Sequence, residues 1–410
     1  MKKISILLII VMLCSMVGCS AKIKSEDLMK DKKLGVVSDT KETAEANVAL
    51  TDFGIRLFQE SLDCEKNTLI SPISVVYALA MTANGAKGET LEQMEAVLGM
   101  SVEELNPYLY HYQKNLPQNK KYEMNLANSI WFTDDEKFHV EDDFLQLNAD
   151  YYSADIYKTA FDEQTVKDIN NWVKQNTKDM IPKILEEIPE HAVMYLVNTL
   201  AFEAEWQSIY YKQQVREGEF TCADGTKQQV EFMYGSEHTY LEDENTIGFL
   251  KYYKDQEYAF VALLPKENMN IADYIAGLDG GQINHLIENR IEGTVEVSIP
   301  KFETEFEIEM KDVLENMGMP IAFDDKAADF SGLGTWTDGN IYINQVLHKT
   351  FISVAEKGTK AGAATLVEMD GESSARDPKE VYLNRPFVYM LIDCRTNIPF
   401  FIGTTVQVND

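Results

Sequence analysis

The sequence predicts an α+β protein with large sheets, because helical periodicity dominates its first two thirds and strand patterns become denser later. Apolar residues recur at near-helical spacing over Leu50–Phe58 and over Trp172–Leu185, where Pro182 interrupts the pattern. Further on, Phe260–Leu264 is a continuous apolar run, and Thr294–Ile299 alternates as a half-buried strand does. Helical and strand segments of this kind together predict helices packed on extensive sheets.

The C-terminal region carries a hairpin pattern, since two apolar runs flank Arg395–Asn397. Of the 410 residues, 45% are hydrophobic and 10% aromatic, which is ample for a substantial core. That length fits two average domains or one large α+β domain. After residue 46 no repeat or long low-complexity tract divides the chain.

The chain is strongly acidic, with 67 acidic against 37 basic residues and a net charge of −30. Nucleic-acid binding requires Lys and Arg to neutralise phosphates, so this balance argues against a nucleic-acid partner. It equally argues against electrostatic docking on anionic lipid. The charge serves solubility, or alternatively steers the protein toward a cationic partner.

The N-terminus has the pattern of a processing segment. Lys2 and Lys3 precede the apolar stretch Ile4–Val11, which is too short for a comfortable membrane span. Met16–Cys19 resembles the lipobox of bacterial lipoproteins, in which the cysteine is lipidated and becomes the new N-terminus. We therefore expect residues 1–19 to be a lipoprotein signal peptide and the exported protein to be anchored to the bacterial membrane through Cys19, with ordinary secretion as the alternative. Residues 20–46 are polar and are predicted to form a flexible tether.

Three cysteines remain after Cys14 and Cys19, so at least one thiol is free; they are Cys64, Cys222 and Cys394. No pair has metal-ligand spacing, and we expect Cys394 to be a buried small apolar group. The sequence contains no nucleophile elbow, zincin motif, P-loop or Cys-x-x-Cys. The six histidines are scattered and none adjoins a nucleophile motif. We therefore expect neither an enzyme nor a cofactor or metal site.

The segment Glu356–Thr365 is the most informative in the chain because it is dense in small residues. With a period of two, Thr359, Ala361, Ala363 and Thr365 fall on one face and Lys360 on the other. A segment that enters a sheet must bury one face without overpacking, and small residues meet that requirement. The alternative is a Gly/Ala-rich surface loop.

The context decides between these alternatives, because the chain resembles the serpin family in a series of motifs that occur in family order. The resemblance runs from about Val48 to Val408 and rests on the hinge pattern Glu356, Gly358, Thr359, Ala361, Ala363, Ala364 and Thr365, and on Asn67–Ser74, Gly85–Thr90, Leu126–Asn128, Ile169–Val173, Val197–Asn198, Trp206, Pro300–Phe302, Asp329–Gly332, Asn384–Ile392 and Pro399–Gly403. It implies the serpin fold over residues 47–410, with about nine helices around three sheets and an exposed reactive-centre loop.

The resemblance also implies roles for single residues. His348 lies eight residues before Glu356, where the family has the histidine of its shutter cluster, and Ser71, Ser74 and Asn198 would be its neighbours. Such a buried network would lie beneath two central strands that must part. The alternative is a single core histidine bonded to a backbone carbonyl. Trp206 would occupy the breach, where an incoming strand first enters.

The implied activity is inhibition of a peptidase, serine or cysteine, by a monomer that acts as a suicide substrate. The protease would attack the loop, and the cleaved loop would insert into the main sheet before the acyl-enzyme is hydrolysed. A non-inhibitory cell-surface binding module is the alternative. Family spacing from Glu356 predicts the reactive bond Glu372–Ser373, within the zone Gly371–Arg376, whereas counting back from Pro386 suggests Ala375–Arg376.

Overall fold

The computed structural model describes residues 22–35, 37, 42–63, 65–117, 121–188, 192–359 and 378–408. Over these residues it contains nine α-helices and three sheets, which confirms the predicted α+β class and the expected numbers of helices and sheets. The helices are α2 (Ala44–Glu60), α3 (Pro72–Ala83), α4 (Gly88–Leu98), α5 (Val102–Lys114), α6 (Asp142–Tyr152), α7 (Glu163–Asn176), α8 (Ile271–Ala276), α9 (Gly280–Glu288) and α10 (Lys311–Met317).

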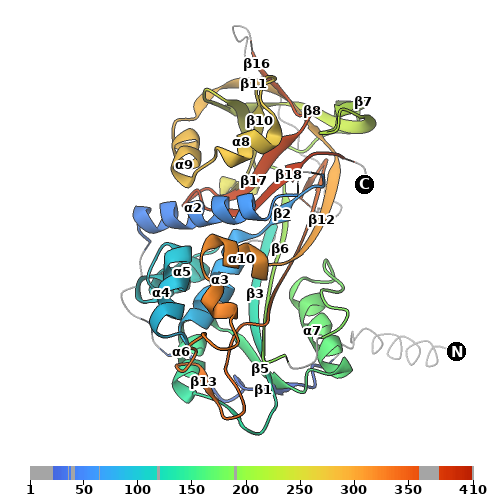
Figure 1. Ribbon diagram of the computed structural model, residues 1–410. Helices are drawn as coiled ribbons and strands as arrows, with labels where there is room; N and C mark the ends of the chain where they lie inside the picture. The colour runs from blue at the N-terminus through green and yellow to red at the C-terminus, as the bar shows by residue number, and fades with distance from the viewer. Residues whose placement is uncertain are drawn as a thin grey trace, which may run out of the picture.

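A seven-stranded sheet forms the long axis of the molecule (Figure 1). Its strands, in spatial order, are β1 (Glu26–Asp27), β5 (Asp155–Thr159), β3 (Tyr122–Thr133), β6 (Met194–Glu205), β15 (Gly358–Thr359), β14 (Gln345–Ala355) and β12 (Phe302–Glu309). In Figure 1, α7 lies on one side of this sheet, and α3 to α6 and α10 lie on the other.

A nine-stranded sheet occupies the end of the molecule opposite β1 and β5 (Figure 1). It contains β16 (Lys379–Tyr382), β11 (Ile291–Pro300), β8 (Lys227–Glu242), β9 (Thr246–Tyr252), β10 (Tyr258–Pro265), β17 (Phe387–Asp393), β18 (Pro399–Thr405) and β2 (Leu69–Ile70), with β7 (Val215–Thr221) paired to β8. The third sheet pairs β4 (Phe138–Val140) with β13 (Gly334–Trp336). The predicted hairpin around Arg395 is confirmed as β17 and β18.

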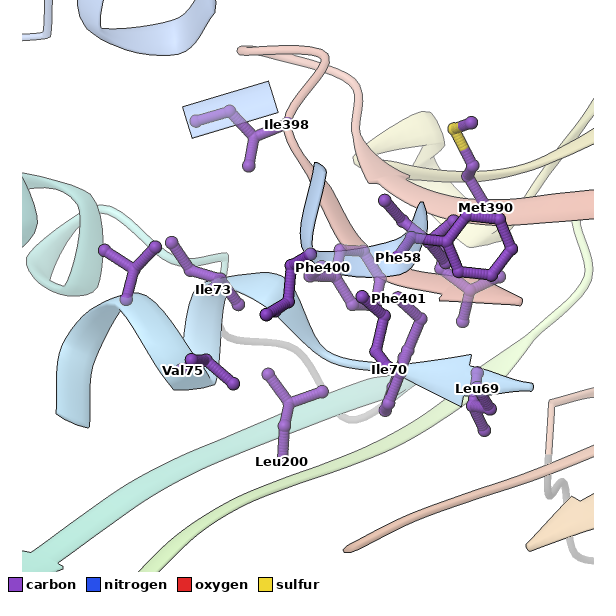
Figure 2. Packing of buried hydrophobic residues seen from close by; sticks show 14 of the residues in the cluster. Phe58, Leu69, Ile70, Ile73, Val75, Leu200, Met390, Ile398, Phe400 and Phe401 are labelled. Atoms are coloured by element: carbon purple, nitrogen blue, oxygen red, sulfur yellow. The ribbon is translucent and has the colours of Figure 1, made fainter. Parts of the chain in front are cut away.

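The main core lies where the two large sheets meet α2 and α3. Figure 2 shows Phe58 of α2, Ile70 of β2, Leu200 of β6 and Phe401 of β18 packed together, and all four are at most 1% exposed. Burial of this much apolar surface fixes β2 and the start of α3 against the middle of the seven-stranded sheet. Pro72 is the first residue of α3, where a missing N–H costs nothing.

The helix predicted over Trp172–Leu185 ends earlier than expected. Helix α7 stops at Asn176, and Lys178 and Asp179 then adopt positive φ values of 50° and 65°. Two successive left-handed residues ahead of Pro182 cannot continue an α-helix. The apolar residues beyond this turn still pack with Trp172 in the same buried cluster, which explains why their spacing looked helical.

The structure also departs from the predicted tether over residues 22–35, named here the N-terminal strap. Its strand β1 pairs with β5, and the Leu28 N–H donates to the Ile156 carbonyl at 2.9 Å. The Asp168 carboxylate on α7 accepts from the N–H groups of Lys24 and Ser25 at 2.9 and 2.7 Å. Backbone groups bind here whatever the side chains are, so polar composition alone did not reveal the docking. Among the described residues, no helix is long and apolar enough to cross a bilayer.

Candidate functional site

The two central strands of the seven-stranded sheet touch at one end and are separated at the other. Strands β6 and β14 form a parallel ladder that covers only Tyr195–Asn198 and Gln345–His348. Toward the opposite end, β15 lies between them and pairs antiparallel with both, Thr359 opposite Val354 and Ala204. The chain therefore leaves β14, turns at Glu356–Lys357, and re-enters the same sheet as β15, next to β14.

Gly358 is required at this re-entry point. Its φ is 150°, and a Cβ atom built on it would lie 1.9 Å from the Ala204 carbonyl oxygen. No other residue fits so close to a neighbouring backbone. Thr359 follows with 2% exposure, and its hydroxyl lies 2.5 Å from that of Tyr253. The predicted inward orientation of Thr359 is thus present in the structure.

Trp206 holds the turn that precedes β15. Its indole Nε1 donates to the Ala355 carbonyl at 2.9 Å, and its backbone N–H donates to the Lys357 carbonyl at 2.8 Å. The fully buried ring stacks on Tyr253 with centroids 4.3 Å apart. Trp206 and Tyr253 together therefore fix both the turn and Thr359.

A buried ion pair lies beside Trp206 and Tyr210, and no sequence pattern predicted it. The Lys251 ammonium is 2% exposed, contacts Glu237 at 2.6 Å and lies 4.4 Å from the Tyr210 ring centroid. Burial lowers the pKa of Lys251, but Glu237 and Tyr210 outweigh burial, so the net shift is upward. Lys251 stays charged beneath the turn, and only the three-dimensional packing reveals it.

Glu356 is held at the turn by an ion pair with Lys301, the residue that precedes β12. The Lys301 ammonium lies 2.9 Å from the carboxylates of both Glu356 and Glu231. The Glu356 carbonyl also accepts from the Tyr210 N–H at 2.8 Å. Glu356 is therefore bound through its side chain by Lys301 and through its carbonyl by Tyr210.

Four residues singled out in the sequence meet below the two central strands. The His348 Nε2 accepts from the Ser71 N–H at 3.0 Å, so the ring proton is on Nδ1, which lies 2.7 Å from the Asn198 Oδ1. The Ser74 hydroxyl donates to the same Oδ1 at 2.8 Å. The structure thus brings Ser71, Ser74, Asn198 and His348 together into one buried network, at the end of the β6–β14 ladder.

This network leaves two polar groups without a hydrogen-bond partner among the described residues, the Ser71 Oγ and the Asn198 Nδ2. Burial lowers the pKa of His348 to about 3, so its ring is neutral at ordinary pH. A neutral ring can accept from Ser71 at the start of α3 and donate to Asn198 on β6, so His348 on β14 links three elements.

Several predicted residues lie outside the described part of the chain. These are the reactive bond Glu372–Ser373, the hinge residues Ala361, Ala363, Ala364 and Thr365, and Cys19. Cys394 is half-buried rather than fully buried, and burial raises its thiol pKa to about 12, so it is a poor nucleophile. Among the described residues, no group of three or more His, Cys, Asp and Glu side chains could hold a metal ion.

Comparisons with known proteins agree with this geometry. The family model "Serpin (serine protease inhibitor)" matches residues 48–408. The leukocyte elastase inhibitor of Xenopus tropicalis is 31% identical over 381 residues, covering 87% of this chain and 97% of that protein. The crystal structure of the thermophilic serpin tengpin in its native state is 49% identical, covers 94% of this chain and 100% of its own, and has a TM-score of 0.91. Human thyroxine-binding globulin, complexed with thyroxine, shares the fold at 23% identity, with coverage of 90% and 100% and a TM-score of 0.80.

The buried His348 predicts a distinctive dependence of stability on pH. An unfolded histidine binds a proton near pH 6.5, whereas the folded one does so only near pH 3. The unfolded state therefore gains protons first, and stability falls by roughly 1 kcal/mol per unit as pH drops below 6.5 toward the folded pKa. Urea unfolding across this range should show the loss in wild type and a smaller loss in His348→Gln. Parallel pH profiles for the two proteins would contradict the buried, neutral histidine.

Proposed function

Because the chain belongs to the serpin family, we propose that it inhibits peptidases, most directly serine proteases, as a suicide substrate whose cleaved loop inserts into the seven-stranded sheet. The observation that carries this proposal is β15, which already occupies the first two positions between β6 and β14. Serpin loop insertion is an established example of strand addition, in which main-chain hydrogen bonds supply the affinity.

The register of β15 defines where the rest of the loop would go. Continued in the same antiparallel register, Thr365 would lie between His348 and Asn198, and Glu368 between Gln345 and Tyr195. Residues up to Ala364 would fill the part of the sheet where β6 and β14 are not paired to each other. Only the residues beyond would have to break the parallel ladder, and the unpaired Asn198 Nδ2 would then gain a neighbouring strand.

The side chains ahead of this register suit insertion. Since Thr359 points inward against Tyr253, alternation in a continued strand would direct Ala361, Ala363 and Thr365 inward as well. Small residues enter without overpacking, and the added strand replaces solvated backbone by ladder hydrogen bonds. The protein with an uncleaved loop would then be kinetically trapped above its most stable state. A carrier or ligand-binding role, the alternative class, requires no such inward series.

The proposal predicts a covalent protease complex. Mixed with a panel of serine and cysteine proteases, the purified protein should give an adduct that resists SDS and boiling with at least one of them. Mass spectrometry of the C-terminal fragment from that adduct should identify Ser373 as its first residue, because the bond proposed for attack is Glu372–Ser373. A fragment that begins elsewhere would move the reactive bond, and cleavage of the loop without any adduct would favour the non-inhibitory binding module.

Thr359→Arg should convert the inhibitor into a substrate. The arginine would place a charge against Tyr253 in a site that is 2% exposed, at a cost of several kcal/mol, and would slow the first step of insertion. Deacylation then competes, so cleaved protein should accumulate and the adduct should decline at least tenfold. Thr359→Ser, which keeps the hydroxyl, is the matched control and should inhibit like wild type. Undiminished adduct in Thr359→Arg would refute insertion through this gap.

We also propose that Cys19 is lipidated and anchors the exported protein to a membrane. The support is the sequence Met16–Cys19 after a short apolar stretch. An acyl-anchored protein should partition with membranes, and Cys19→Ser should become soluble or stay unprocessed. Membrane retention of a processed Cys19→Ser protein would refute this anchor.

A further inference from the structure

The N-terminal strap lies at the end of the seven-stranded sheet toward which the loop would insert. One row of paired residues crosses the sheet from β1 to β14: Asp27, Tyr157, Trp131, Tyr195 and Gln345. In Figure 1, β1 and β5 lie at the bottom of the view, and β16, which follows the loop in sequence, lies at the top. The strap and β16 therefore lie at opposite ends of the molecule.

The register places the end of an inserted loop beside this row. Continued from Thr359, the strand would reach the row at Glu368, nine residues on. The bond after Glu372 would then lie four residues further, about 13 Å beyond the row. A protease joined through the Glu372 carbonyl would thus be held just past the edge that the strap covers.

The lateral distance is too small for both to occupy this edge. Strands β15 and β1 are four strands apart in the sheet, which amounts to about 19 Å. A protease domain of roughly 220 residues has a radius of gyration of about 17 Å, so its surface extends further than that from its centre. We propose that the protease carried to this end of the sheet displaces the N-terminal strap from β5 and α7, an inference that rests on the proposed inhibitory function.

The contacts of the strap suit displacement as a unit. Its ladder to β5 has two residue pairs, and Asp168 accepts from the Ser25 hydroxyl at 2.8 Å as well as from two backbone N–H groups. The Gly35 N–H donates to Asp150 at 2.7 Å on α6. Ile23 packs against the cluster beneath α7, Leu28 and Met29 pack against the main core, and Lys32 forms an ion pair with Asp142 on α6. These contacts are local to the edge of the sheet, and a short edge segment can open at lower cost than global unfolding.

Displacement would change the reach of the proposed lipid anchor. With the strap docked, only Ser20 and Ala21 separate Cys19 from the body. With the strap released, the connection to Ala44 lengthens to roughly 24 residues, with an average span of about 25–30 Å if it behaves as a random coil. The body could then move away from the membrane and leave room for the protease at the end nearest the anchor.

Hydrogen exchange of the strap tests this inference in three forms of the full chain: uncleaved, loop-cleaved without bound protease, and in covalent complex. The amides of Lys24, Ser25, Leu28 and Gly35 should be protected in the first two and should lose protection in the complex. Protection that persists in the complex would overturn the displacement. If no covalent complex forms with any protease, the proposed function fails first, so the two failures are distinguishable.

A reversible crosslink provides the second test. Glu26 and Lys158 face each other in the β1–β5 ladder, at a spacing typical of disulfides. The double variant E26C/K158C should, when oxidised, need several times more inhibitor per protease inactivated, because the strap cannot leave. Its reduced form is the matched control and should behave like wild type. Equal stoichiometry in the oxidised and reduced forms would overturn the proposal.

Discussion

The arrangement of the central sheet depends on β15, the two-residue strand that Gly358 and Thr359 form between β6 and β14. The backbone at Gly358 approaches the Ala204 carbonyl so closely that only glycine fits, and Thr359 is fixed by the Tyr253 hydroxyl. Because Gly358 and Thr359 provide ladder partners for both strands, β6 and β14 are separated by one strand at this end. Between Thr359 and the ladder that begins at Asn198 and His348, β6 and β14 are not paired to each other, and β15 begins to fill this gap in the sheet.

The opposite end of the gap is closed by a small number of interactions. Four rows of parallel pairing join β6 to β14, and the His348–Asn198 hydrogen bond lies at the last row before the strands diverge. Ser71, at the start of α3, reaches this row because the core around β2 and α3 packs directly beneath it. The closed sheet is therefore stabilised by contacts that an inserted strand would replace rather than simply remove.

The sequence predicted those parts of the fold that depend on periodicity and on family motifs. Sequence patterns predicted the helix around Phe53, the hairpin around Arg395 and the shared face of Thr359 and the small hinge residues. The family motifs predicted that His348 lies near Ser71 and Asn198, as the structure shows. The Lys251–Glu237 pair and the docking of residues 22–35 were not predictable. Both depend on long-range packing, the second on backbone donors that carry no sequence signature.

After cleavage of the loop, we expect the segment after Thr359 to become a strand between β6 and β14. A crystal structure of the loop-cleaved protein tests it directly. We expect a continuous antiparallel strand through Thr365 and Glu368, with the Tyr195–Asn198 and Gln345–His348 segments separated by one strand width, about 9–10 Å apart across the new strand. A cleaved structure in which the His348–Asn198 hydrogen bond and the four-row parallel ladder persist would contradict the account.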